Sequence, residues 1–261
     1  MPRKAAIAFA AVLLAAAAVW AVVGLVAQFQ DNAEQEQIFD RLRGTVQAKS
    51  ITDLSGETGS GTETAAGASG QEKTGHDISL LQEENSDCIG WVSIEGTNLD
   101  YPVMQTLDEP EYYLKRSFEK SPNEHGVPFL DARCSVDRAD NLIVYGHHMN
   151  DGTMFSCLHK YAKYSYYEEH PLITWETANG IDQYRVAAVM RASGTVYEKD
   201  WSIFNCIYMN ELEFEEMSEN LLEKSLYNTG IAPVYGDKLL TLATCEYSQE
   251  NGRLVVVAVK Q

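Results

Sequence analysis

Cysteine and basic residues are scarce in this chain of 261 residues. The five cysteines form an odd set with no CxxC pair. Their number and spacing argue against a disulfide framework and against a zinc site built on paired thiols. Only 20 Lys and Arg stand against 38 Asp and Glu, which gives a formal net charge of -18. A phosphate-binding surface needs clustered basic side chains, so nucleic acid is not expected as a partner.

A long hydrophobic run occurs at the N-terminal end. Residues 5–27 are uncharged and rich in Ala, Val and Leu, close to the roughly 20 residues that a helix needs to cross a bilayer. This run exceeds the apolar part of a cleavable signal, which favours an uncleaved anchor, although Ala-x-Ala triplets leave removal open. Arg3 and Lys4 precede the run and acidic residues follow it. The positive-inside rule therefore predicts a cell-membrane, single-pass protein with a cytoplasmic N-terminus, in which everything beyond residue 28 is extracellular.

Composition divides the chain into four predicted regions. Residues 1–28 are the cytoplasmic stub and transmembrane signal anchor, and residues 29–49 form a juxtamembrane helix with apolar side chains at helical spacing. Residues 50–75 are rich in Gly, Ser, Thr and Glu and cannot bury enough surface to fold, so a flexible linker is expected. Residues 76–261 are long enough for one domain with a substantial core.

Short β-rich runs separated by turn signals dominate that domain. This pattern favours a closed or nearly closed barrel over a sheet of alternating strands and helices. The predicted strands are Gly90–Ile94, Leu99–Gln105, Val127–Asp131, Asn141–His147, Leu172–Glu176, Tyr184–Ala192, Leu239–Cys245 and Arg253–Val259. The predicted helices are Ile78–Glu84, Pro110–Arg116, Met154–Tyr161 and Asn210–Tyr227, the last with Phe214, Met217, Leu221 and Leu222 on its apolar face.

Three strand ends carry the side chains of a cysteine acyl-transfer site. The run Lys-Leu-Leu-Thr-Leu-Ala-Thr leads into Cys245, the final strand begins at Arg253, and Asn-Leu-Ile-Val-Tyr-Gly leads into His147. Taken singly, a His or Cys at a strand end is more often an ordinary packed residue. Together they supply a nucleophile, a proton carrier and a fixed positive charge. Because side chains alternate along a strand, His147 and His148 cannot both face one site, and His147 is the candidate.

The motifs around these residues resemble those of the sortases, the cysteine transpeptidases of the Gram-positive bacterial surface. The resemblance rests on Thr-Leu-Ala-Thr-Cys at 241–245 followed by Arg253, on Val-Tyr-Gly-His at 144–147, and on the N-terminal anchor. It extends from about His76 to the end of the chain. Tyr-Pro-Val-Met-Gln at 101–105, Gly-Val-Pro-Phe-Leu-Asp at 126–131 and a long helical insertion before the cysteine strand are similar to class B.

This resemblance implies a mainly β fold: a closed eight-stranded sortase-type β-barrel with peripheral helices. It also implies that His147, Cys245 and Arg253 are catalytic. The positions that match the family's groove for the substrate motif are Tyr145, Thr244, Glu246 and Leu114. Two residues depart from the class B pattern: Ala243 replaces a common serine, and Pro110 replaces a common asparagine. Both departures bear on the preferred motif and leave the chemistry intact. For Tyr145 and Leu114, plain core packing is an equal alternative.

The implied reaction is a transpeptidation through a Cys thioester. Cys245 attacks the carbonyl of Thr in a C-terminal sorting motif, His147 protonates the leaving amine, and Arg253 donates to the oxyanion or the motif backbone. The partners are secreted proteins with that motif and an amine of a cell-wall precursor or a pilin. Spacing predicts no metal site, with Asp131, Asp137 and Asp140 as turn residues, and no cofactor is expected. The alternatives are a cysteine peptidase or hydrolase that releases the acyl group to water, and a non-catalytic peptide-binding ectodomain.

Overall fold

The computed structural model describes residues 17–24, 32–44, 75–194, 201–246, 248 and 251–261. The chain divides into two compact units, Met1–Arg41 and Leu42–Gln261. Helical turns cover residues 17–24 and 32–44. Most of the predicted anchor at 1–28, and the predicted linker at 50–75 except its last residue, lie outside the described residues. Within the described parts, no helix combines the length and hydropathy needed to cross a membrane.

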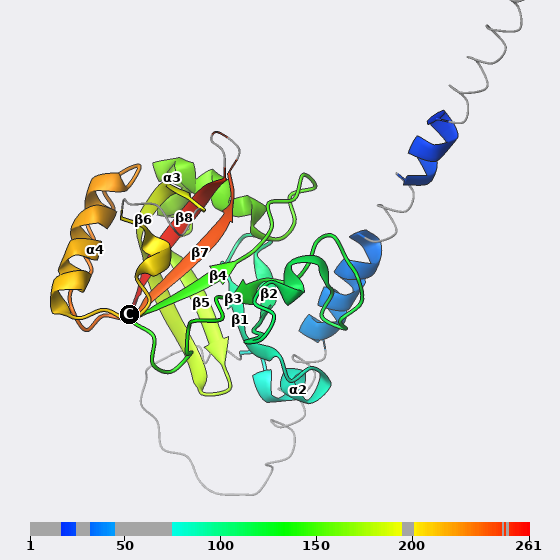
Figure 1. Ribbon diagram of the computed structural model, residues 1–261, viewed down its shortest axis with the longest axis horizontal. Helices are drawn as coiled ribbons and strands as arrows, with labels where there is room; N and C mark the ends of the chain where they lie inside the picture. Colours follow the sequence, from blue (N-terminus) through cyan, green and yellow to red (C-terminus); the bar gives the residue numbers. More distant parts are fainter. Residues whose placement is uncertain (1–16, 25–31, 45–74, 195–200, 247, 249–250) are drawn as a thin grey trace, which may run out of the picture. The chain divides into compact units, whose positions relative to one another are not determined.

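Eight strands form a closed barrel in the second unit (Figure 1), which confirms the predicted barrel. The order around the barrel is β1-β2-β3-β4-β7-β8-β6-β5, and β1 pairs with β5 to close it. The β2–β3 and β4–β7 pairs are parallel and the others are antiparallel. The strands are β1 (Cys88–Ser93), β2 (Asp100–Met104), β3 (Phe129–Leu130), β4 (Asn141–Tyr145), β5 (Leu172–Thr177), β6 (Gly180–Ser193), β7 (Leu239–Cys245) and β8 (Gly252–Lys260).

Strand β7 lies between β4 and β8, and the three run side by side in Figure 1. Every residue of β7 before Cys245 is buried, and β8 is buried from Leu254 to Val259. Strands covered on both faces need continuous apolar runs, which explains why their sequences do not alternate with polar residues. The register pairs Tyr145 with Ala243 across β4 and β7, and Cys245 with Arg253 across β7 and β8.

Peripheral helices cover the barrel and the loops between its strands. They are α2 (Ile78–Glu84), η1 (Tyr112–Lys115), η2 (Phe155–Ala162), α3 (Tyr164–Glu169), η3 (Ile203–Asn205) and α4 (Glu211–Lys224). The segments predicted as helices near 110–116 and 154–161 are 3₁₀-helices, with bonds such as Leu114 N–H to Glu111 O at 2.9 Å. Helix α3 was not predicted, and its Tyr164 ring packs edge-on against Tyr227 from the segment after α4.

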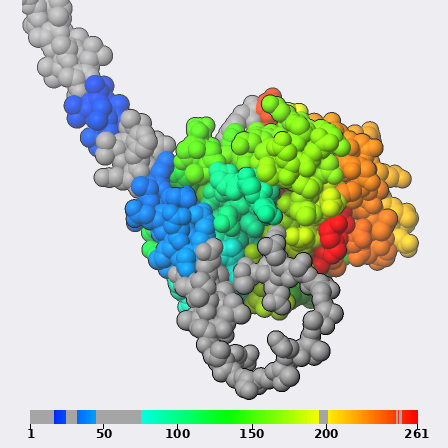
Figure 2. All heavy atoms as spheres, turned by 180° about the vertical axis from the view of Figure 1, so that it is seen from behind, coloured from blue at the N-terminus to red at the C-terminus, as the bar shows by residue number. Residues whose placement is uncertain are grey.

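Helix α4 begins where the sequence places a capping box. The Asn210 side chain accepts from the Glu213 N–H, and the Glu213 carboxylate accepts from the Asn210 N–H. These two bonds satisfy amides that have no partner within the helix. Phe214, Met217 and Leu221 are buried as predicted, whereas Leu222 is 48% exposed and does not belong to the apolar face. The segment containing α4 forms the orange surface of Figure 2.

Candidate active site

The thiol, imidazole and guanidinium predicted from the sequence line a single cavity of about 450 Å³. Cys245 is the last residue of β7 and lies opposite Arg253 on β8. Directly opposed residues in an antiparallel pair have Cβ atoms about 5 Å apart, which brings these two side chains together. His147 follows β4, whose continuation Gly146 donates its N–H to Ala243 O at 3.1 Å. The end of β4 therefore meets the β7–β8 pair, about a hundred residues later in the sequence, at one end of the barrel.

A backbone carbonyl orients the His147 ring. Its Nε2 atom lies 2.7 Å from Leu114 O, so Nε2 carries a proton and donates it. In the neutral imidazole, Nδ1 is then the acceptor nitrogen. Gly126 packs on this carbonyl with φ of +59°, and a Cβ there would lie 2.5 Å from Leu114 O. Leu114 lines the cavity as well, so this residue of η1 both shapes the cavity and sets the direction of the imidazole.

Two backbone carbonyls hold the Arg253 guanidinium in place. Its Nη1 atom donates to Gly252 O at 2.9 Å and to Asn251 O at 3.3 Å. A Cβ added to Gly194 would lie 2.9 Å from Arg253 Cζ, so the absence of a side chain at 194 makes room for the guanidinium. A guanidinium has five N–H donors. Held in this way, it keeps a positive charge beside the Cys245 position at any pH of interest.

Burial separates Cys245 from the other cysteines. All five lie in the described part of the chain and none forms a disulfide. Burial raises the pKa of the four enclosed thiols: to about 12 for Cys88 and Cys206, and to about 11 for Cys134 and Cys157. Cys245 is half-buried at the cavity wall. Because a thiolate nucleophile needs access to its substrate, Cys245 is the thiol suited to acyl transfer.

Of the other predicted groove positions, Tyr145 and Thr244 line the cavity and Glu246 does not. Tyr145 and Thr244 line the cavity together with Ala243 and Pro110. Thr244 is 1% exposed, and its Oγ1 has no hydrogen-bond partner among the described residues. Glu246 does not line this cavity.

The Glu246 carboxylate is held by a neighbouring hydroxyl. It accepts from Ser248 Oγ at 2.6 Å and lies 3.7 Å from Arg191 Nε. The hydrogen bond from Ser248 lowers the Glu246 pKa, and the positive charge of Arg191 adds to the shift. Glu246 therefore places a negative charge one residue beyond the thiol.

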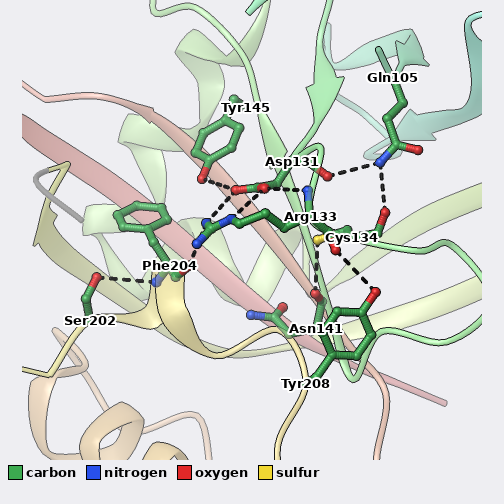
Figure 3. A network of polar contacts seen from close by, with 9 residues as sticks. All are labelled: Gln105, Asp131, Arg133, Cys134, Asn141, Tyr145, Ser202, Phe204 and Tyr208. Atoms are coloured by element: carbon green, nitrogen blue, oxygen red, sulfur yellow. Dashed lines mark hydrogen bonds and ion pairs between the residues drawn. The ribbon is translucent and has the colours of Figure 1, made fainter. Parts of the chain in front are cut away.

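A buried carboxylate anchors the Tyr145 side of the cavity (Figure 3). The Asp131 carboxylate accepts from Arg133 Nε at 2.9 Å, from Arg133 Nη2 at 2.7 Å and from Tyr145 Oη at 3.0 Å. Arg133 Nη2 also donates to Phe204 O at 2.8 Å, which ties the loop after β3 to η3. Burial opposes ionisation of Asp131, but the hydrogen bonds from Arg133 outweigh it and lower the pKa of the carboxyl. Tyr145 thus faces a charged acceptor, and burial raises the pKa of its phenol.

Sequence reasoning interpreted Asp131 as a turn residue and missed this network. The available signal was an Asp-x-Arg spacing at the end of an apolar strand, which permits a carboxylate and a guanidinium to pair locally. Of the 147–148 pair, His147 lines the cavity, and His148 stacks on His159 with ring centroids 3.9 Å apart. Among the described residues, no group of three or more His, Cys, Asp or Glu side chains is placed to hold a metal ion.

Comparisons with known proteins give one consistent match. The family model described as a Sortase domain matches residues 92–261. Sortase B of Staphylococcus aureus is 32% identical over 191 residues, covering 72% of this chain and 76% of that protein. A structure titled Staphylococcus aureus sortase B-substrate complex superposes with a TM-score of 0.64 at 33% identity, covering 70% of this chain and 84% of that one. Sortase B of Clostridium perfringens superposes with a TM-score of 0.64 at 28% identity, covering 70% and 98%.

Proposed function

Because the chain belongs to the sortase family and its relatives are class B sortases, we propose that it is a membrane-anchored cysteine transpeptidase. It cleaves a C-terminal sorting motif after Thr and transfers the acyl group to an amine of cell-wall peptide or of a pilin. The observation that carries this proposal is the convergence of Cys245, His147 and Arg253 on one cavity, with the thiol directly opposite the guanidinium. A relative solved with substrate supports reading this cavity as a peptide groove.

The first half-reaction forms a thioester. The Cys245 thiolate attacks the carbonyl carbon of the motif Thr, and the carbonyl electron pair moves to oxygen. Arg253 donates to that oxyanion, and losing one such donor typically lowers the rate about 10²- to 10³-fold. As the tetrahedral species collapses, the C–N bond breaks, and Nδ1 of His147 gives the leaving amine the proton that it took from the Cys245 thiol. Leu114 O accepts the other ring proton, that of Nε2, at 2.7 Å and keeps the ring oriented.

The second half-reaction consumes the thioester. An incoming amine attacks the acyl carbon, loses a proton to His147, and expels the Cys245 thiolate, so the enzyme returns to its starting state. If water attacks instead, the products are a free acid and the same enzyme, which is the hydrolase alternative. The two reactions share the thioester and differ only in the acceptor.

A product-mass experiment tests the proposal. The full chain, purified in detergent, is incubated with a panel of Thr-containing sorting peptides and excess triglycine, and products are identified by mass spectrometry. We expect a triglycine adduct of the fragment ending in Thr, together with a thioester on Cys245 at early times. Cys245→Ala should abolish both, while the matched control Cys157→Ala, which removes a buried thiol, should retain them. A free acid in place of the adduct favours the hydrolase, and peptide binding without any cleavage favours the non-catalytic ectodomain.

The membrane anchor is a separate part of the proposal and has a separate test. Its support is the uncharged apolar run at residues 5–27, preceded by Arg3 and Lys4. We expect the full chain to sediment with membranes and to resist extraction by high salt and alkaline carbonate. A variant lacking residues 1–28 should stay in the supernatant. Release of the full chain by carbonate would contradict the anchor without affecting the active-site chemistry.

A further inference from the structure

The Cys245 carbonyl lies where the β-ladder ends. Pairing between β4 and β7 runs to Tyr145 and Ala243, and the Gly146 N–H extends it with the bond to Ala243 O. Successive carbonyls of a strand point to opposite sides, so the next one facing β4 is that of Cys245. The chain after Gly146 has turned toward η2 by this point: the His147 carbonyl accepts from Phe155 N–H at 2.9 Å. The Cys245 carbonyl therefore needs a donor from outside the sheet.

That donor is a side chain of η2. His159 Nε2 lies 2.9 Å from Cys245 O, and η2 packs on both β7 and β8. A carbonyl can only accept, so Nε2 carries the proton. The bond restrains the peptide that follows the Cys245 Cα, and through it the direction of the thiol. It joins residues 86 positions apart, so it depends on the folded barrel.

The same ring also contacts the histidine that follows His147. The rings of His148 and His159 stack with centroids 3.9 Å apart and an interplanar angle of 23°. His148 is linked to Met154 in a short antiparallel bridge, so the stack lies on an ordered turn. One imidazole therefore connects the end of the strand that carries the thiol to the turn that carries the catalytic imidazole.

We propose that His159 is a positioning residue for acyl transfer, which sets the geometry between Cys245 and His147 by bonding the Cys245 carbonyl and stacking on His148. This inference rests on the proposed function of Cys245. His159 acts through these two neighbours and does not line the cavity, so it has no contact with the reacting atoms. Displacing a reacting group by about 1 Å can lower a rate by about 10²-fold, which is the scale of effect that a lost restraint of this kind produces.

Two substitutions separate the bond from the stack. His159→Phe keeps an aromatic ring over His148 but has no donor, whereas His159→Gln has an amide N–H that can reach the Cys245 carbonyl. The control is His170→Phe: the His170 Nδ1 atom also bonds a backbone carbonyl, Glu95 O at 2.9 Å, but that carbonyl lies between β1 and β2, which carry none of the three catalytic side chains. Thermal unfolding of each full-length variant shows whether it remains folded at the assay temperature.

The first measurement is steady-state transpeptidation of a sorting peptide. We expect His159→Phe to lower kcat about 10- to 100-fold with little change in KM, because the restraint acts on the chemical step. His159→Gln should recover most of kcat, and His170→Phe should match the wild-type protein. A residue with a purely structural role would lower the melting temperature and leave kcat of the folded fraction unchanged, and that result would overturn the inference.

The second measurement needs no substrate. The rate constant for alkylation of Cys245 by iodoacetamide is followed by peptide mass spectrometry in the same four proteins. We expect a several-fold change in His159→Phe that His159→Gln reverses. Equal rate constants in all four overturn the inference, whether or not any peptide is turned over. Conversely, an inactive wild-type protein with altered alkylation in His159→Phe would refute the proposed transpeptidase and leave the positioning role intact.

Discussion

Replacing Asp131 with Asn tests how strongly the carboxylate network supports the Tyr145 side of the cavity. Asp131 accepts three side-chain hydrogen bonds, two from Arg133 and one from Tyr145. Asn has nearly the same size, so no void forms. Its Oδ1 can still accept from Arg133 Nε, but its NH₂ group then faces the Nη2 donor. Asp131 Oδ2 accepts from both Arg133 Nη2 and Tyr145 Oη, so the substitution removes the charge-assisted bond from Nη2 and the negative charge, and the Tyr145 hydroxyl has to turn to accept from the NH₂ group.

The expected loss is about 1–2 kcal/mol. Hydrogen bonds to charged groups contribute about 1.5–3 kcal/mol each. The Asp131 side chain is 10% exposed, but that of Arg133 is 47% exposed, so solvent screening places the value at the low end of that range or just below it. For a domain of this size each 1 kcal/mol shifts the melting temperature by about 2–4 °C. A decrease of about 2–8 °C is expected for Asp131→Asn.

The assay is thermal and urea unfolding at pH 7, followed by circular dichroism. The matched control is Asp182→Asn, which removes the partner of Lys260 in an ion pair whose side chains are 37% and 41% exposed. Exposed pairs contribute about 0–1 kcal/mol, so the control should change little. A double-mutant cycle with Arg133→Met should show coupling between the two sites. If Asp131→Asn is no more destabilising than the control, or if the two substitutions are additive, the reasoning is refuted.

Three further predictions concern residues around the catalytic side chains. Gly194→Ala places a methyl group 2.9 Å from Arg253 Cζ. Because this displaces one oxyanion donor, we expect kcat in the peptide assay to fall about tenfold or more, and an unchanged kcat would contradict this role of Gly194. Gly146→Ala places a methyl group 2.6 Å from the Phe155 ring; overpacking should lower the unfolding free energy by about 1–3 kcal/mol in urea titrations, and a negligible cost would show that the turn relaxes. Burial and the neighbouring imidazole lower the His148 pKa below its usual 6.5. Below that pH the unfolded chain binds a proton that the folded chain does not, so the free energy of unfolding falls as pH drops. Calorimetric scans from about pH 7 to pH 5 should show a smaller fall in melting temperature for His148→Asn than for the wild-type protein, and the same fall in both would exclude this origin.

The strands that carry the site could be predicted because they are buried on both faces and their sequences are therefore almost wholly apolar. Residues of β4, β7 and β8 are covered on both faces, so their apolar, β-branched runs stand out from the turns around them. The reactive residue types at their ends then indicated the chemistry. The alternation rule indicated that only one histidine of the 147–148 pair faces the site, and the position of His147 at the strand end favoured it.

Contacts that depend on tertiary distance could not be predicted in the same way. The bond from His159 to the Cys245 carbonyl joins an exposed-looking helix position to a strand end 86 residues away, and nothing local to either segment specifies it. Asp131 resembled a turn residue because its partner Arg133 also lies in the turn, and only the burial of Asp131 beside Tyr145 shows the network. Leu222 fits the apolar periodicity of α4, but it is exposed in the folded domain, which the periodicity alone does not reveal.

The order of β7 and β8 in the chain places the cysteine of this site before the arginine that faces it. A half-finished barrel already holds the cysteine on β7, but it lacks the arginine that faces it. The pairing of β4 with β7 includes a hydrogen bond from Thr241 Oγ1 to Asn141 Oδ1, which are 100 residues apart. Closing this loop costs entropy, and the pairing can form only after both segments have been synthesised. A chain emerging from synthesis or clipped before its final strand therefore carries a thiol without its guanidinium. Without that donor the oxyanion is not stabilised, so acylation of such an incomplete chain is disfavoured.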